Sequence, residues 1–178
     1  MIIMVNGPPG SGKDEVCRIL SGMNFVHMQM KEELFKDTVK YFNVDYDWFM
    51  DGYDRTQKEV AEPSLKGMSR RESLIHVSEN VMKPQHGKGY YGKRAAENMK
   101  DGVDYSFSDS GFVEEVEQII NKFGMDEIIF IRLYRDDCDY SSDSRRYIRF
   151  NNLVKEMVCD HKTDISKFED QFFPEVVD

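Results

Sequence analysis

The run from Gly7 to Asp14, G-P-P-G-S-G-K-D, constrains this chain more than any other segment. An apolar stretch at residues 1–5 predicts a short buried strand before it, and apolar residues at helical spacing follow Lys13. Glycines let backbone N–H groups turn inward around an anion, and the positive end of the next helix adds attraction. The pattern G-x-x-x-x-G-K between strand and helix therefore predicts a phosphate-binding loop, with Lys13 reaching the β- and γ-phosphates of ATP. The residues expected to hold the nucleotide are Gly7, Gly10, Ser11, Gly12, Lys13, Asp14 and Glu15.

The eighth position of this loop departs from the motif, because Asp14 stands where Ser or Thr is usual. A carboxylate is a hard oxygen ligand that suits Mg²⁺, directly or through a water molecule. A carboxylate at this place also favours the positive end of the helix without binding a metal. Asp14 is therefore a candidate Mg²⁺ ligand, with the electrostatic interpretation as its alternative.

Predicted strands and helices alternate along the chain. Strands are expected at 1–5, 24–30, 104–108, 127–134 and 157–159, and helices at 13–22, 32–42, 69–81, 93–100, 112–123, 144–154 and 166–172. Residues 83–92, with Pro84 and three glycines, predict a mobile loop. The alternation predicts an α/β protein with three α/β/α layers around a parallel sheet of about five strands. We expect one domain over 1–178.

The overall charge and composition argue against several classes of protein. A net charge of −9 disfavours stable binding to nucleic acid or to an anionic membrane. The sequence holds no apolar run near the ~20 residues of a membrane-spanning helix, and no signal peptide, so we expect a cytoplasmic protein. The three cysteines are odd in number and far apart, which does not suit a disulfide framework. Cys159 and His161 lack the further ligands of a zinc site.

Asp109 and the segment 135–149 are further candidates for the functional site, because each follows a predicted strand. Asp109 follows the strand 104–108, at the edge where doubly wound sheets bind ligands. It is a second candidate Mg²⁺ ligand or, alternatively, a cap on the helix expected from Phe112. Residues 135–149 begin with Arg135 and contain further arginines, and predict either a lid that excludes water or a solvated run of charge.

Several segments resemble one protein family, the bacteriophage-type deoxynucleoside monophosphate kinases of the P-loop superfamily. The loop ending G-S-G-K-D is the most specific of them. The others are F-K-D at 35–37 followed by Y-F-N-V at 41–44, D-G-Y-D-R at 51–55, S-R-R-E-S-L at 69–74, G-Y-Y at 89–91, S-D-S-G-F at 108–112 and I-R-L-Y-R at 131–135.

The resemblance implies a P-loop kinase fold that moves the γ-phosphoryl group of ATP, with Mg²⁺, to a deoxynucleoside monophosphate. It implies an acceptor-binding region at about 31–94 and a protein that works as a monomer or homodimer, in the host cytoplasm if phage-encoded. Candidate acceptor-binding residues are Lys36, Arg55, Arg71, Tyr91 and Arg94. Candidate catalytic residues are Lys13, Arg71, Asp109 and Arg135. Tyr91 is expected either to stack on a base or to pack in the core.

One position departs from the family pattern. Gly111 stands where the family has an arginine that is expected to meet phosphate, and Arg94 or Arg71 is the expected substitute. Three alternatives therefore stay open beside the nucleotide kinase. They are a kinase of another small acceptor such as a modified nucleotide, a kinase acting on nucleic-acid ends, and a nucleotide-binding module without catalysis.

Overall fold

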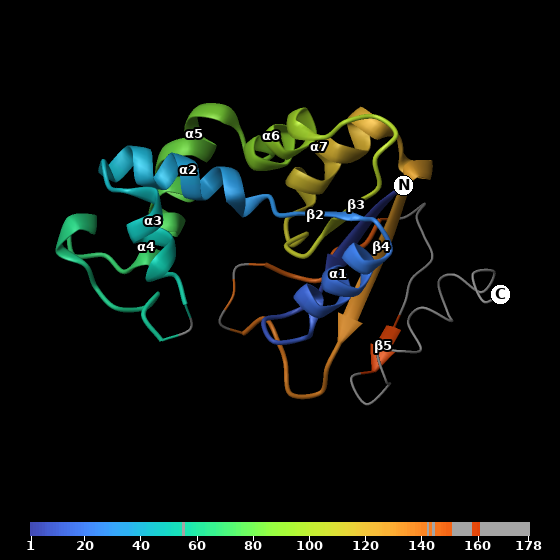
Figure 1. The fold of residues 1–178 in the computed structure, drawn as a ribbon, viewed down its shortest axis with the longest axis horizontal. Helices are drawn as coiled ribbons and strands as arrows, with labels where there is room; N and C mark the ends of the chain where they lie inside the picture. The colour runs from blue at the N-terminus through green and yellow to red at the C-terminus, as the bar shows by residue number, and fades with distance from the viewer. Residues whose placement is uncertain (55, 142, 144, 151–157, 161–178) are drawn as a thin grey trace. The chain divides into compact units, whose positions relative to one another are not determined.

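The chain forms a parallel β-sheet with helices (Figure 1). This computed structural model describes residues 1–54, 56–141, 143, 145–150 and 158–160. The strand order is β2-β3-β1-β4-β5, and every pair of neighbours is parallel. The strands are β1 (Ile2–Asn6), β2 (Val26–Met28), β3 (Tyr105–Phe107), β4 (Ile128–Tyr134) and β5 (Val158–Asp160). The prediction of an α/β protein with a parallel sheet is confirmed.

Helices connect the strands in chain order. They are α1 (Lys13–Gly22), α2 (Lys31–Phe42), α3 (Tyr46–Asp51), α4 (Arg70–His76), the π-helix η2 (Val77–Met82), α5 (Lys83–His86), α6 (Tyr90–Asn98) and α7 (Val113–Phe123). Two short 3-10 turns are η1 (Pro63–Leu65) and η3 (Met125–Glu127). Within the described part of the chain, no helix is both long and apolar enough to cross a membrane.

The chain divides into two compact units. The sheet unit comprises Met1–Met28, Lys100–Val113 and Phe123–Asp178, and the helical unit comprises Gln29–Met99 and Glu114–Lys122. The sheet unit contains all the strands, α1 and the segment after β4, whereas α2 to α6 belong to the helical unit.

The core of the sheet unit is built around β1, whose five residues are all buried. Strands of a parallel sheet are covered on both faces, which explains a continuous apolar run in place of an alternating pattern. Ile3 and Val5 pack in one cluster with α1 and β4. The other members of that cluster are Val16, Cys17, Leu20, Phe25, Ile131 and Leu133. Burying each such aliphatic side chain contributes roughly 1.5–3 kcal/mol, so this cluster fixes where β1 ends and the Gly-rich loop begins.

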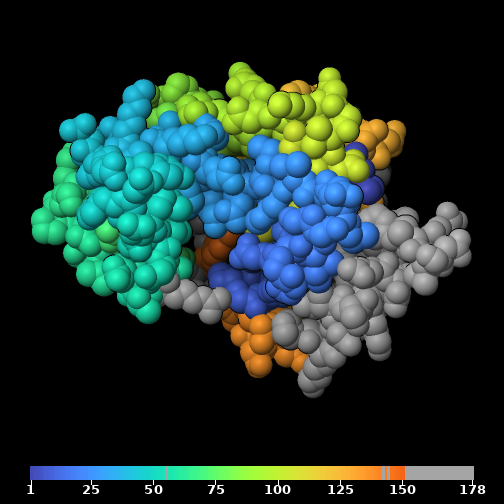
Figure 2. All heavy atoms as spheres, in the orientation of Figure 1, coloured from blue at the N-terminus to red at the C-terminus, as the bar shows by residue number. Residues whose placement is uncertain are grey.

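The helical unit has a separate core of Phe35, Phe49, Leu65 and Leu74. Its helix α4 begins with the expected capping box, in which Ser69 accepts from the Glu72 N–H and the Glu72 carboxylate accepts from the Ser69 N–H. Some large side chains of this unit remain exposed, among them Tyr41, Tyr46 and Val60. They lie in the segment drawn from light blue to green in Figure 2.

Three element predictions are corrected by the structure. The segment 83–92 is not a loop, because α5 and α6 occupy most of it. The helix expected at 69–81 changes from α-helix to π-helix at Val77. The expected strand 24–30 is shorter and covers Val26–Met28.

The helix expected at 144–154 is absent as far as residue 150 in the described residues. Short acidic side chains bind the backbone here instead, since Asp139 accepts from the Ser141 N–H at 2.9 Å and Asp143 from the Arg145 N–H at 2.9 Å. Such local bonds compete with helix formation. The helix expected at 166–172 lies outside the described residues.

Candidate nucleotide site

The Gly-rich loop follows β1 directly and leads into α1 within the sheet unit. Gly10 and Gly12 have φ angles of 81° and 96°, a left-handed conformation that other residues adopt only at a cost. Gly12 is the N-cap of α1, and its carbonyl accepts from the Val16 N–H at 3.1 Å. The loop therefore ends at the first turn of α1, whose backbone N–H groups have no acceptors within the helix itself. This geometry suits an anion.

Lys13 is the first residue of α1, and its side chain folds back over the loop. Its Nζ donates to the Pro8 carbonyl at 2.7 Å, and the Ser11 N–H donates to the same carbonyl at 3.2 Å. The ammonium group therefore lies beside the backbone that a phosphate would contact. A lysine acts there as a movable point charge.

The two acidic residues after Lys13 differ in their surroundings. Glu15 is held by Arg18, whose Nε donates to its Oε2 at 2.9 Å, and this bond lowers the pKa of Glu15. Asp14 is exposed in the same helical turn. Because Glu15 already has a cationic partner, Asp14 is the better candidate for a metal ligand of the two.

Asp109 lies at the same edge of the sheet as the loop. The charge of Asp109 affects the pKa of the Cys17 thiol in α1. The pKa of Cys17 is raised to about 12, mainly by burial; the charges of Asp14 and Asp109 contribute in the same direction, and Lys13 opposes them. Lys13 and Asp14 begin α1 after the loop that follows β1, and Asp109 follows β3, the parallel neighbour of β1, so all three lie at the carboxyl edge of the sheet. The structure brings together what the sequence places almost a hundred residues apart.

Asp14 and Asp109 are the candidate Mg²⁺ ligands of the sequence analysis. Within the described residues, no group of three or more His, Cys, Asp or Glu side chains is arranged to hold a metal ion. Mg²⁺ is usually held by only one or two carboxylates, with water and substrate phosphates as the other ligands. One or both of Asp14 and Asp109 would suffice as the protein ligands of such a site.

Arg135 also reaches the loop. It follows β4, and its Nη1 donates to the Gly10 carbonyl at 2.7 Å. Cys138 is nearby, since its Sγ is 3.3 Å from where a Cβ on Gly10 would be. The sequence predicted Arg135 as a site residue, and the structure places its guanidinium at the loop.

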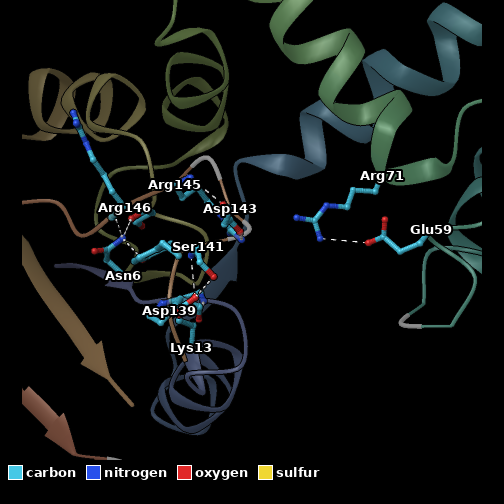
Figure 3. A network of polar contacts seen from close by, with 12 residues as sticks. Asn6, Lys13, Glu59, Arg71, Asp139, Ser141, Asp143, Arg145 and Arg146 are labelled. Atoms are coloured by element: carbon cyan, nitrogen blue, oxygen red, sulfur yellow. Dashed lines mark hydrogen bonds and ion pairs between the residues drawn. The ribbon is translucent and has the colours of Figure 1, made fainter. Parts of the chain in front are cut away.

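Asn6, the last residue of β1, was not predicted as a site residue but organises this edge (Figure 3). Its Nδ2 lies 2.8 Å from the Ser110 carbonyl, 3.2 Å from the Tyr140 hydroxyl and 3.1 Å from the Arg146 carbonyl. Its Oδ1 accepts from the Ile148 N–H at 3.1 Å. One buried amide thus fixes two loops from distant parts of the chain. The signal in the sequence is a polar residue ending an otherwise apolar strand, since a buried amide requires partners.

The candidate acceptor residues Lys36 and Arg94 lie in the helical unit, where carboxylates neutralise their positive charges. Arg94 forms an ion pair with Glu33 and donates to Asp37 Oδ1 at 2.9 Å. Lys36 Nζ lies 2.5 Å from Glu33 Oε1. This network joins α2 to α6, and both cations already have carboxylate partners.

Arg71 is more accessible than its neighbour Arg70. Arg70 is buried, donates to Glu62 at 2.8 Å and packs over the Trp48 ring at 4.4 Å. The Arg71 side chain is 37% exposed, with Glu59 3.4 Å away (Figure 3). Arg70 therefore stabilises the helical unit, while Arg71 has its guanidinium at the surface.

Tyr91 is 2% exposed, and burial raises its pKa. The packing interpretation therefore holds for Tyr91, because no open ring face is left for a base. Its neighbour Tyr90 stacks on His86, with ring centroids 4.6 Å apart. The remaining candidate, Arg55, lies outside the described residues.

No protein-family model matches this sequence, and no curated protein matches it significantly.

Proposed function

We propose that this protein is a phosphotransferase that moves the γ-phosphoryl group of ATP to a small phosphorylated acceptor. By the sequence resemblance, the acceptor is a deoxynucleoside monophosphate and the product its diphosphate. The observation that carries the proposal is the Gly-rich loop with Lys13 folded over it, at the carboxyl end of a buried parallel strand. Asp109 and Arg135 come to the same edge from other strands, as a site for a charged ligand requires.

The donor side of the reaction is assigned to the loop. Its backbone N–H groups and the start of α1 bind the phosphate oxygens, and Lys13 leaves the Pro8 carbonyl to neutralise the β- and γ-phosphates. Asp14 and Asp109 are the residues that would hold Mg²⁺, which supplies positive charge to the phosphate oxygens. Arg135 adds a cation next to Gly10.

The chemical step needs positioning and charge neutralisation more than covalent catalysis. An oxygen of the acceptor phosphate forms a new bond to the γ-phosphorus. The bond from that phosphorus to the oxygen bridging to the β-phosphate breaks, and its electron pair leaves with ADP. The acceptor phosphate is ionised at neutral pH, so no side chain has to remove a proton.

On the acceptor side, Arg71 is the candidate that the contacts favour. Its side chain is 37% exposed, and its ion pair with Glu59 is long at 3.4 Å. A guanidinium suits a phosphate because it offers parallel N–H donors. Arg94 and Lys36 are better explained as the ion pairs that hold α2 and α6 together.

Equilibrium binding of MgATP tests this proposal. We expect the wild-type protein to bind MgATP, and Lys13→Ala to weaken binding about 10- to 100-fold, because a charged contact with phosphate is lost. Arg18→Ala is the matched control, since Arg18 is an exposed cation on the same helix, paired with Glu15. Absence of MgATP binding, or equal affinity of the Lys13→Ala variant, would contradict the assignment.

A further inference from the structure

Gly111 and Arg145 occupy one space in the sheet unit. A Cβ on Gly111 would lie 2.5 Å from Cδ, 2.7 Å from Cγ and 2.9 Å from Cβ of Arg145. All three distances are shorter than carbon atoms tolerate, so the stem of Arg145 lies directly against the backbone at residue 111. Any larger residue at position 111 would have to displace Arg145.

The guanidinium of Arg145 is held by a local carboxylate (Figure 3). Its Nε donates to Asp143 Oδ1 at 2.8 Å and its Nη2 to Oδ2 at 2.5 Å. This two-point contact uses two of the five N–H donors of a guanidinium. The side chain of Arg145 is 28% exposed, so it is not sealed in the core.

The position of Arg145 is fixed relative to the Gly-rich loop through Asn6. The Asn6 amide donates to the carbonyls of Ser110 and Arg146, the neighbours of Gly111 and Arg145. Asn6 is also the residue immediately before Gly7. The contact between Gly111 and Arg145 is therefore built into the carboxyl end of β1, where the loop starts. By contrast, the side chain of Arg146 extends away from Asn6 (Figure 3).

The charge of the candidate metal ligand Asp109 also acts on Arg145. The pKa of Arg145 is raised, first by its hydrogen bond with Asp143 and also by the charges of Asp143 and Asp109. Asp109 is two residues before Gly111, whose backbone lies against the Arg145 stem, so Arg145 is next to the segment that carries this candidate ligand.

We propose that Arg145 is the residue that contacts the terminal phosphoryl group of the nucleotide, and that Gly111 positions it by leaving room for its stem. The inference rests on the proposed function, because it assumes that the loop binds a nucleoside triphosphate. Arg145 exchanges part of its contact with Asp143 for the phosphoryl oxygens, which a guanidinium binds through paired N–H donors. Gly111 is in this account a positioning residue, and it touches no phosphate.

Equilibrium binding of MgATP and MgADP to the full chain tests this inference. We expect Arg145→Ala to weaken MgATP binding about tenfold and to leave MgADP binding within about twofold, because only ATP carries the terminal group. Arg145→Lys should recover part of the loss, since it keeps the charge without the paired donors. Thermal unfolding of each variant checks that it folds like the wild type.

A double-mutant cycle isolates the role of Gly111. We expect Gly111→Ala to weaken MgATP binding as Arg145→Ala does, and to have no added effect in the Arg145→Ala background. Additive effects, unchanged MgATP affinity of Arg145→Ala, or equal loss of MgATP and MgADP with a lowered melting temperature would overturn the inference. Failure of the nucleotide-binding premise is distinguishable, because the wild-type protein would then bind neither nucleotide, whereas failure of phosphoryl transfer would appear as nucleotide binding without a diphosphate product.

Discussion

At the scale of single residues, the two acidic residues of the first turn of α1 offer a matched comparison. Asp14 is exposed, whereas Glu15 is bound by Arg18. We expect Asp14→Asn to raise the Mg²⁺ concentration needed for half-maximal MgATP binding about tenfold, because a metal ligand loses its charge. A Mg²⁺ titration at fixed ATP concentration measures this.

Glu15→Gln is the control for that titration, because it removes the same charge from the same turn. An unchanged titration curve in Asp14→Asn, or an equal shift in both variants, would assign Asp14 to the helix terminus alone.

Gly111 illustrates which contacts of the candidate site can be predicted from the sequence and which cannot. The loop residues and Arg135 were named as candidates because a motif with a known mechanism and the end of a strong strand indicate them, and the structure places Arg135 against the loop. The expected substitute for an arginine at position 111 was Arg94 or Arg71. The structure instead places the stem of Arg145 against Gly111. No local pattern predicts that contact, because Asn6 creates it by joining loops far apart in the sequence.

At the scale of elements, α6 and α7 meet at a glycine. A Cβ on Gly92 would lie 2.0 Å from the carbonyl oxygen of Glu115, so the two backbones are in direct contact. We expect Gly92→Ala to lower the free energy of unfolding by about 1–3 kcal/mol, because the helices must separate. Urea denaturation followed by circular dichroism measures it.

Gly22→Ala is the matched control, since Gly22 ends α1 and a Cβ there meets nothing within 4 Å. It should leave stability unchanged or slightly higher, because alanine favours a helix. Equal effects of the two substitutions would show that the contact at Gly92 does not limit helix packing.

This contact also explains why residues 83–92 were wrongly predicted as a loop. Glycine-rich segments are read as turns because glycine is flexible and breaks helices. Here Gly92 lies inside α6, and its missing side chain allows close packing on α7. By contrast, the capping box at Ser69 predicted the start of α4 correctly, since its bonds lie within four residues. Local bonds are visible in a sequence, whereas contacts between helices are not.

At the scale of the whole molecule, pH couples to folding through the buried thiol of Cys17. Its pKa is raised to about 12, from an ordinary value of 9.0, mainly by burial. Above pH 9 the unfolded thiol ionises and the folded one does not, so stability is complete below pH 9 and is lost toward pH 12. Burial raises the pKa of Tyr140 as well, in the same direction.

We therefore expect the melting temperature to fall as the pH rises above 9.0, the ordinary thiol pKa, toward about 12. Cys17→Ala should fall less steeply over that range, and Cys138→Ala controls for the removal of a thiol. Thermal unfolding at several pH values measures the slopes. Equal slopes for the wild type and Cys17→Ala would show that Cys17 does not carry the dependence.

The overall architecture was predictable because it repeats along the chain. Apolar runs followed by helical patterns predicted the parallel sheet, and the position of Asp109 after a strand predicted its place at the loop edge. The division into a sheet unit and a helical unit was not predicted. Such a division depends on which helices pack together, and residues 29–99 and 114–122 do so across a long gap in the sequence.

Phosphoryl transfer itself can be followed in a coupled measurement of both products. The wild-type protein is incubated with MgATP and each common nucleoside monophosphate, ribo and deoxy, while ADP release and diphosphate formation are followed. We predict ADP and diphosphate in equal amounts with one or a few deoxynucleoside monophosphates, and no turnover in Lys13→Ala. Tight MgATP binding without diphosphate from any acceptor would contradict the claim of a nucleoside monophosphate kinase.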